Sequence, residues 1–306
     1  MSLYDNILET IGHTPLVRLH KFEEKYKLQN KIFLKLESFN PGYSVKTRPA
    51  YGMIKSLYDS GEMTKDTTII EATSGNTGIG LAMVGAYFGN DTIIIMPEKV
   101  SKERVDTIKH YGAKVILTKA DDGIQGAKDK AIELLQDMNA VIPSQFENPE
   151  NPNMHYDTTA KELANDLEVI DYIFAGVGTG GTISGVGRYF KKHHPITKMI
   201  AIEPKNSQVL QGKKPAPHKI AGISPGYIPG NYDPDVVDEI VAVGDEESWK
   251  MTKEFVRLEA ISIGISTGAA LQAVLNYIKK HGLKNCNIVC ISPDSGEKYF
   301  STGVFE

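Results

Sequence analysis

Cysteine is scarce in this sequence, since the 306 residues contain only Cys286 and Cys290. If the apolar stretch 287–291 is a strand, these two residues lie about 13 Å apart, which is too far for a disulfide. The chain therefore has no disulfide framework of the kind that stabilises small secreted proteins. We expect two free thiols in the core of a protein from a reducing compartment, the cytoplasm.

The sequence also lacks long hydrophobic runs and a strong excess of one charge. No apolar run approaches the roughly 20 residues of a membrane-spanning helix, and the N-terminus shows no signal-peptide pattern. Lys and Arg number 34 against 38 for Asp and Glu, so no basic field favours nucleic acid. These absences predict a protein that acts on a small molecule and binds neither membrane nor nucleic acid.

Apolar strand-like segments and helical segments alternate along the chain, in two series separated by the proline-containing stretch 143–152. Such alternation predicts an α/β fold with open, mostly parallel sheets covered by helices. The length allows two domains, and we expect a boundary near residue 146. Strands are predicted at 31–37, 67–71, 92–96, 114–118, 171–174, 199–202, 236–243 and 287–291, and helices at 46–59, 76–88, 101–111, 123–138, 156–167, 184–193 and 269–281.

The segment 174–187, where an expected strand leads into an expected helix, contains six glycines. Backbone N–H groups and the helix dipole converge at such a turn, and Thr179 and Thr182 add hydroxyl donors. We therefore predict a phosphate site rather than an ordinary tight turn. The spacing Gly176-x-Gly178-x-x-Gly181 also matches a dinucleotide fingerprint, with Glu203 as the ribose acid, so a nicotinamide cofactor and another phosphorylated cofactor both stay open here.

Three further segments carry polar groups at expected helix starts. Lys46 follows an Asn-Pro turn, and the dipole of the helix behind it favours a neutral amine that can form a Schiff base. A solvated surface lysine fits the same spacing. The segment Glu71–Gly78 collects hydroxyls, an amide and N–H groups, which suits a carboxylate. In the segment 263–270, Ser266 or Thr267 can cap the following helix.

These motifs together resemble the cysteine synthase (O-acetylserine sulfhydrylase) family, whose relatives include cystathionine β-synthase. The resemblance rests on Asn40-Pro with Ser-Val-Lys46, Glu71-Ala-Thr-Ser-Gly-Asn-Thr-Gly, Gly176-Val-Gly-Thr-Gly-Gly-Thr and Gly264-Ile-Ser-Thr-Gly, in order over nearly the whole chain. It implies an enzyme of the tryptophan-synthase-β type, fold type II, with pyridoxal 5'-phosphate as cofactor. It also implies a smaller, mobile N-terminal domain at 42–146 and a larger domain made of 1–41 and 147–306.

The resemblance implies a role for each residue of these motifs. Lys46 looks like the Schiff-base lysine that also moves the substrate's α-proton. The expected cofactor contacts are Gly178, Thr179, Gly180, Gly181 and Thr182 for the phosphate, Asn76 for the ring hydroxyl and Ser266 for the ring nitrogen. The expected substrate contacts are Thr73, Ser74, Thr77 and Gln145 for the α-carboxylate, with Gly222 at the cleft rim.

The expected reaction is a β-replacement through an aminoacrylate, in which O-acetylserine and sulfide give cysteine. The alternative is a cysteine lyase that releases hydrogen sulfide and adds water to form serine. Asp233 is the candidate base for that water, although it could instead cap or brace its own loop. Tyr43 and Thr47 flank Lys46 where the family often has Gly and Asp. A nicotinamide-dependent dehydrogenase and a catalytically silent binding protein are the other classes, and a homodimer and a serine acetyltransferase partner are family expectations.

Overall fold

The computed structural model describes residues 3–98 and 100–305, and the chain forms two compact units. The first unit is Asn40–Asn151 together with the N-terminal segment up to Ile11. The second unit is Gly12–Phe39 together with the chain from Pro152 onward. None of the described helices is long and apolar enough to cross a membrane. That residues 42–146 form an independent, mobile domain stays a prediction.

The first unit is built on a parallel four-stranded sheet in the order β5-β4-β3-β6. Every residue of β3 is buried, and β4 is buried except at its last residue. Strands that are buried on both sides in this way are expected where helices cover both faces of a parallel sheet. The strands are β3 (Thr68–Ala72), β4 (Thr92–Pro97), β5 (Lys114–Thr118) and β6 (Ala140–Val141).

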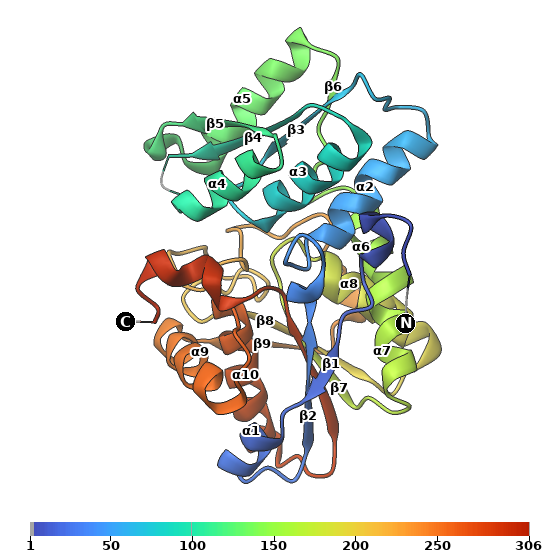
Figure 1. The fold of residues 1–306 in the computed structure, drawn as a ribbon. Helices are drawn as coiled ribbons and strands as arrows, with labels where there is room; N and C mark the ends of the chain where they lie inside the picture. Colours follow the sequence, from blue (N-terminus) through green and yellow to red (C-terminus); the bar gives the residue numbers. More distant parts are fainter. Residues whose placement is uncertain (1–2, 99, 306) are drawn as a thin grey trace. The chain divides into compact units, whose positions relative to one another are not determined.

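Helices cover both faces of this sheet (Figure 1). On one face α2, α3 and α4 pack against Ile69 and Ile94. On the other face α5 packs against Ile70 and Ile95, because successive strand residues point to opposite sides. The helices are α2 (Thr47–Asp59), α3 (Asn76–Phe88), α4 (Lys102–His110) and α5 (Gly123–Asp137).

The second unit holds a six-stranded sheet in the order β1-β2-β10-β7-β8-β9. Only β1 runs antiparallel, at the edge beside β2, and the other pairings are parallel. The strands are β1 (Leu16–Arg18), β2 (Lys31–Leu36), β7 (Tyr172–Gly176), β8 (Lys198–Pro204), β9 (Glu239–Val243) and β10 (Asn287–Ser292).

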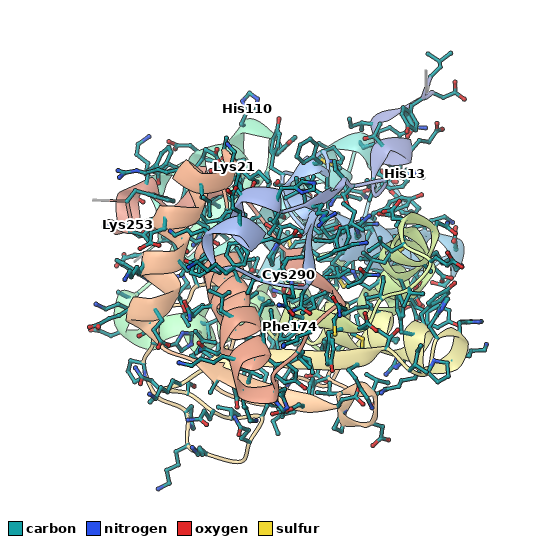
Figure 2. All side chains as sticks on the ribbon, turned by 90° about the horizontal axis from the view of Figure 1, so that it is seen from below. His13, Lys21, His110, Phe174, Lys253 and Cys290 are labelled. Atoms are coloured by element: carbon teal, nitrogen blue, oxygen red, sulfur yellow. The ribbon has the colours of Figure 1, made fainter. Side chains whose placement is uncertain are left out.

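The helices of the second unit also lie on both faces of its sheet (Figure 1). Phe174 and Cys290 pair across neighbouring strands and face the core shared with α1, α9 and α10 (Figure 2). Ile173 and Val289 face the opposite core, with α7 and α8. The helices are α1 (His20–Lys25), α7 (Ala160–Asp166), α8 (Gly181–His193), α9 (Asp245–Glu259) and α10 (Ile265–His281).

Both cysteines are free, as the sequence predicts, but Cys290 is buried in the core whereas Cys286 is only partly buried. Burial raises the pKa of the Cys290 thiol, so this residue behaves as a core hydrophobe. The sequence did not predict β1, α1, β6, α9 or the short helix Glu150–Met154. The predicted strand 236–243 begins only at Glu239, because Pro234–Val236 form a short helical turn that the side chain of Asp233 caps.

Candidate active site

Lys46 directly precedes α2 and is half-buried. The helix α3 packs closely against this point, since a methyl group added at Gly80 would lie 3.0 Å from the carbonyl oxygen of Lys46 and 3.1 Å from Cβ of Ala50. Glycine at position 80 is what allows the approach. The structure thus brings Lys46 and the beginning of α3 together within the first unit.

The loop 73–77 joins β3 to α3. Thr73 and Thr77 are buried, and the hydroxyl of Thr73 accepts the N–H of Gly75 at 3.3 Å. Arg104 on α4 donates from Nη1 to the carbonyl oxygen of Ser74 at 3.2 Å. Sequence reasoning missed Arg104, because nothing in its local pattern marks it. Its guanidinium adds positive charge beside donors that suit a carboxylate.

Gln145 lies against this loop, although 68 positions separate it from Thr77. The Thr77 hydroxyl donates to Oε1 of Gln145 at 2.5 Å, and Asn151 Nδ2 donates to the Gln145 carbonyl oxygen at 2.7 Å. Gln145 is 5% exposed. Because the amide oxygen of Gln145 accepts from Thr77, the Nε2 group, which carries the donor hydrogens, is directed away from Thr77. The structure therefore gathers Thr73, Thr77 and Gln145 into one polar cluster.

The glycine-rich segment joins β7 to α8 in the second unit. Gly180 has φ +83°, and a methyl group there would lie 2.7 Å from the backbone nitrogen of Tyr232. A methyl group at Gly178 would overlap the carbonyl oxygen of Gly222. The segment 222–232 therefore packs directly on the glycine turn. The N–H groups at the start of α8 and the positive end of its dipole remain suited to an anion.

His155 is a second residue that sequence reasoning missed. Its Nε2 lies 3.2 Å from the hydroxyl of Thr182, and its Nδ1 lies 2.9 Å from the hydroxyl of Thr159. The residue is 1% exposed and starts the wide helical turn His155–Thr159, which follows α6 (Glu150–Met154). A lone histidine before a helix gave no signal, but its ring fixes Thr182 at the glycine turn.

Ser266 lies in the first turn of α10 and is 5% exposed. Within residues 3–98 and 100–305, the structure shows no hydrogen-bond partner for its hydroxyl. The neighbouring hydroxyl of Thr267 lies 3.0 Å from that of Ser292. Since capping of α10 does not use the Ser266 side chain, this buried hydroxyl suits a ligand.

The match to known proteins extends over nearly the whole chain. Residues 7–294 match the family described as "Pyridoxal-phosphate dependent enzyme". The chain belongs to this family. It is therefore an enzyme whose cofactor is pyridoxal 5'-phosphate, as the resemblance in the sequence implied.

Individual relatives of this pyridoxal-phosphate enzyme are similar from end to end. A cysteine synthase from Staphylococcus aureus is 43% identical over 303 residues, which cover 98% of this chain and 97% of that protein. A cysteine synthase structure from Entamoeba histolytica has a TM-score of 0.96 at 39% identity, covering 99% of this chain and 91% of that one. A hydrogen sulfide-producing enzyme from Fusobacterium nucleatum has a TM-score of 0.94 at 41% identity, covering 98% and 99%. These likenesses confirm the predicted α/β fold, which is that of fold type II pyridoxal-phosphate enzymes.

The residues of the chain fit this cofactor. The turn at Gly178 and Gly180 has no space for side chains, yet it presents the N-terminus of α8, which favours a phosphate group. The buried hydroxyl of Ser266 can donate to or accept from a ring nitrogen. Among the described residues, no group of three His, Cys, Asp or Glu side chains could hold a metal ion.

Asp233 makes contacts that brace the segment around it. One carboxylate oxygen accepts the N–H of Asp235 at 3.2 Å, and the other accepts from Arg188 Nε at 2.8 Å. Its own N–H donates to the hydroxyl of Ser184 on α8 at 2.9 Å. These are the contacts expected of the capping and bracing alternative. The role of Asp233 as a base for water stays a prediction.

Glu203, which a dinucleotide site would use for the ribose, has another set of partners. It is 1% exposed, and its two oxygens accept from the N–H of Leu210 and from Gln211 Nε2, each at 2.9 Å. It therefore holds the turn after β8, which speaks against the dehydrogenase alternative. A cavity of about 1180 Å³ in the second unit is lined by Lys219, Trp249 and residues of α9, and none of the predicted site residues lines it.

Proposed function

We propose that this enzyme is a cysteine synthase, which replaces the acetate of O-acetylserine with sulfide to form cysteine. The observation that carries the proposal is the packing of α3 on Lys46 through Gly80, which places a lysine and the Thr77–Gln145 cluster in one compact unit. An α-amino acid substrate needs a carboxylate site near the group that moves its α-proton. The names of the S. aureus and E. histolytica relatives support this choice of reaction.

Residues of the motifs would hold the cofactor. Lys46 would bind it through its ε-amine, and Asn76 would bond the ring hydroxyl. Ser266 would bond the ring nitrogen, and the segment Gly178–Thr182 would hold the phosphate. When bound, the cofactor withdraws electrons from the substrate's α-carbon. A neutral hydroxyl at position 266 leaves this withdrawal weaker than an acid would, which suits β-elimination better than transamination.

The remaining groups would act on the substrate. Thr73, Ser74, Thr77 and Gln145 would bind its α-carboxylate, and the ε-amine of Lys46 would take the proton from its α-carbon. Gly222 would border the site. The carboxylate contacts would orient the substrate so that its Cα–H bond points toward the lysine. Such orientation of the reacting groups contributes to catalysis.

A second candidate is a cysteine lyase that releases hydrogen sulfide and forms serine. The observation that favours it is the similarity to the hydrogen sulfide-producing enzyme of F. nucleatum. Water must lose a proton before it adds, so this reaction needs a positioned base, for which Asp233 is the candidate. Sulfide is already partly ionised at neutral pH and needs no such base.

The test is product analysis of the purified enzyme. We expect cysteine from O-acetylserine plus sulfide. Failure to form cysteine, together with release of sulfide and serine from cysteine alone, would replace the synthase with the lyase.

The family resemblance also supports a cytoplasmic homodimer that binds serine acetyltransferase. Light scattering of the purified enzyme, alone and with that partner, tests both assemblies. A monomer that elutes separately from the acetyltransferase would contradict them.

A further inference from the structure

Glu71 begins the motif that ends at Gly78, yet none of the roles above uses it. It lies on β3, the third strand of the first sheet, and only 4% of it is exposed. A carboxylate at this depth needs hydrogen bonds or an opposite charge to offset the loss of water. The contacts of Glu71 therefore indicate what it does.

The carboxylate of Glu71 accepts from the backbone where the pairing of β3 with β6 ends. The two strands pair only as far as Ile69 and Val141. Pro143, just beyond, has no N–H, and Ser144 adopts a left-handed φ of +57°. The N–H of Ser144 donates to Oε2 of Glu71 at 3.0 Å. The side chain thus replaces a backbone acceptor and holds a turn that is strained for a non-glycine residue.

The residue after this turn is Gln145. Its backbone N–H also stabilises the ionised form of Glu71. Thr77 fixes the amide of Gln145, and Asn151 fixes its carbonyl oxygen. Glu71 therefore acts on two successive N–H groups and ties the backbone of Ser144 and Gln145 to β3.

We propose that Glu71 is a positioning residue, which holds the Ser144–Gln145 backbone so that the Gln145 amide meets the α-carboxylate of the amino-acid substrate. This inference rests on the proposed function, which gives Gln145 that contact. Glu71 itself touches neither substrate nor cofactor in this role.

The protonation of Glu71 should make substrate affinity depend on pH, and this dependence can be measured. Burial raises the pKa of Glu71 to about 7, and the two N–H groups and Lys128 on α5 lower it by less. Among the described residues, Lys128 is the charged side chain that acts on Glu71. Protonation turns one carboxylate oxygen into a donor, so one N–H loses its acceptor. Substrate affinity should therefore decrease as the pH falls through 7.

The test compares native enzyme, Glu71→Gln and the control Glu62→Gln, an exposed residue of the same unit whose carboxylate accepts from the Ser60 hydroxyl. The glutamine at position 71 cannot ionise and mimics the protonated acid. We expect Glu71→Gln to raise the KM for O-acetylserine about tenfold at pH 8, with kcat changed less than threefold. Below pH 7 the native KM should rise toward that of the variant. Hydrogen exchange of the 142–148 backbone should be faster in Glu71→Gln and unchanged in Glu62→Gln.

If the KM of Glu71→Gln at pH 8 equals that of the native enzyme, the inference is overturned. Gln145→Ala separates this failure from that of the proposed contact: if it raises KM while Glu71→Gln does not, only the role of Glu71 fails. If the native enzyme does not use O-acetylserine, calorimetric binding of L-alanine, which carries the same carboxylate, replaces KM. If Glu71→Gln does not fold, a native KM that stays constant from pH 6 to pH 8 overturns the proposal.

Discussion

At the scale of single residues, Lys46 is the group on which turnover should depend most. It lies before the first turn of α2 and is half-buried, so its side chain contributes little to the core. We expect Lys46→Ala to fold and to bind pyridoxal phosphate only noncovalently. Turnover should fall by at least a thousandfold, and the visible absorption of a lysine-linked cofactor should be lost.

The matched control is Lys55→Ala, on the helix that follows Lys46. Lys55 is exposed and forms an ion pair with Asp59, so its loss should change stability little and leave the spectrum unchanged. Circular dichroism checks the fold of both variants. Retention of the lysine-dependent band in Lys46→Ala would remove Lys46 from its proposed role.

Asp233 can be tested at the same scale, because its two roles predict different pairs of results. If Asp233 is the base, Asp233→Asn should suppress serine formation from cysteine about a hundredfold while sulfide release continues. Arg188→Gln breaks the same ion pair but keeps the carboxylate, so it should leave serine formation intact. Equal loss in both variants would show that Asp233 only braces its segment. Serine and sulfide are quantified in the same reaction.

At the scale of elements, the turn between β7 and α8 has no space for a side chain. A methyl group at Gly178 would overlap the carbonyl oxygen of Gly222, so either the turn or the segment 222–232 must shift. Gly178→Ala should therefore lower affinity for pyridoxal phosphate more than tenfold and destabilise the apoprotein by about 1–3 kcal/mol. Fluorescence titration measures the affinity.

The control for the turn is Gly61→Ala in an exposed loop of the first unit, where an added methyl group meets nothing within 4 Å. Its φ of +78° makes alanine unfavourable, which should cost about 1 kcal/mol of stability but no cofactor affinity. Equal cofactor affinity in Gly178→Ala and native enzyme would contradict a phosphate site at this turn.

Elements with an apolar run of the right length between turn residues could be predicted from the sequence. The predicted helix 76–88 agrees with α3, and the predicted strand 114–118 agrees with β5. The elements that were missed are short or rich in charge. β1 has only three residues and forms by pairing with the edge of β2. α9 has acidic residues throughout its first turn, so its apolar face is difficult to recognise in the sequence.

At the scale of the whole molecule, the motifs predicted which segments matter but not how they contact each other. Gln145 was assigned through family resemblance, while its bonds to Thr77 and Asn151 come from tertiary packing. The bond between Glu71 and Ser144 spans 73 positions, and that between His155 and Thr182 spans 27. No local pattern encodes such distances, so Glu71, Arg104 and His155 could be recognised only in the folded chain.

Glu71 also links the stability of the molecule to pH. Its pKa is about 7 in the folded chain and about 4.5 when exposed, because burial penalises the charged form. Between these values the folded chain binds more protons than the unfolded chain, so the free energy of unfolding falls as the pH rises. The stabilisation is complete below pH 4.5 and is lost as the pH passes 7, a change of about 3 kcal/mol.

Glu71→Gln isolates this contribution, since it cannot ionise and the other groups titrate alike in both proteins. We expect the unfolding free energy of native apoprotein, measured in urea from pH 5 to pH 8, to fall relative to that of the variant across the range. A constant difference would contradict the raised pKa. The difference in unfolding free energy should fall as the pH rises, while the KM of the native enzyme decreases. Both results together would show that the ionised carboxylate orders the Gln145 turn at the expense of stability, as is common where function needs a buried charge.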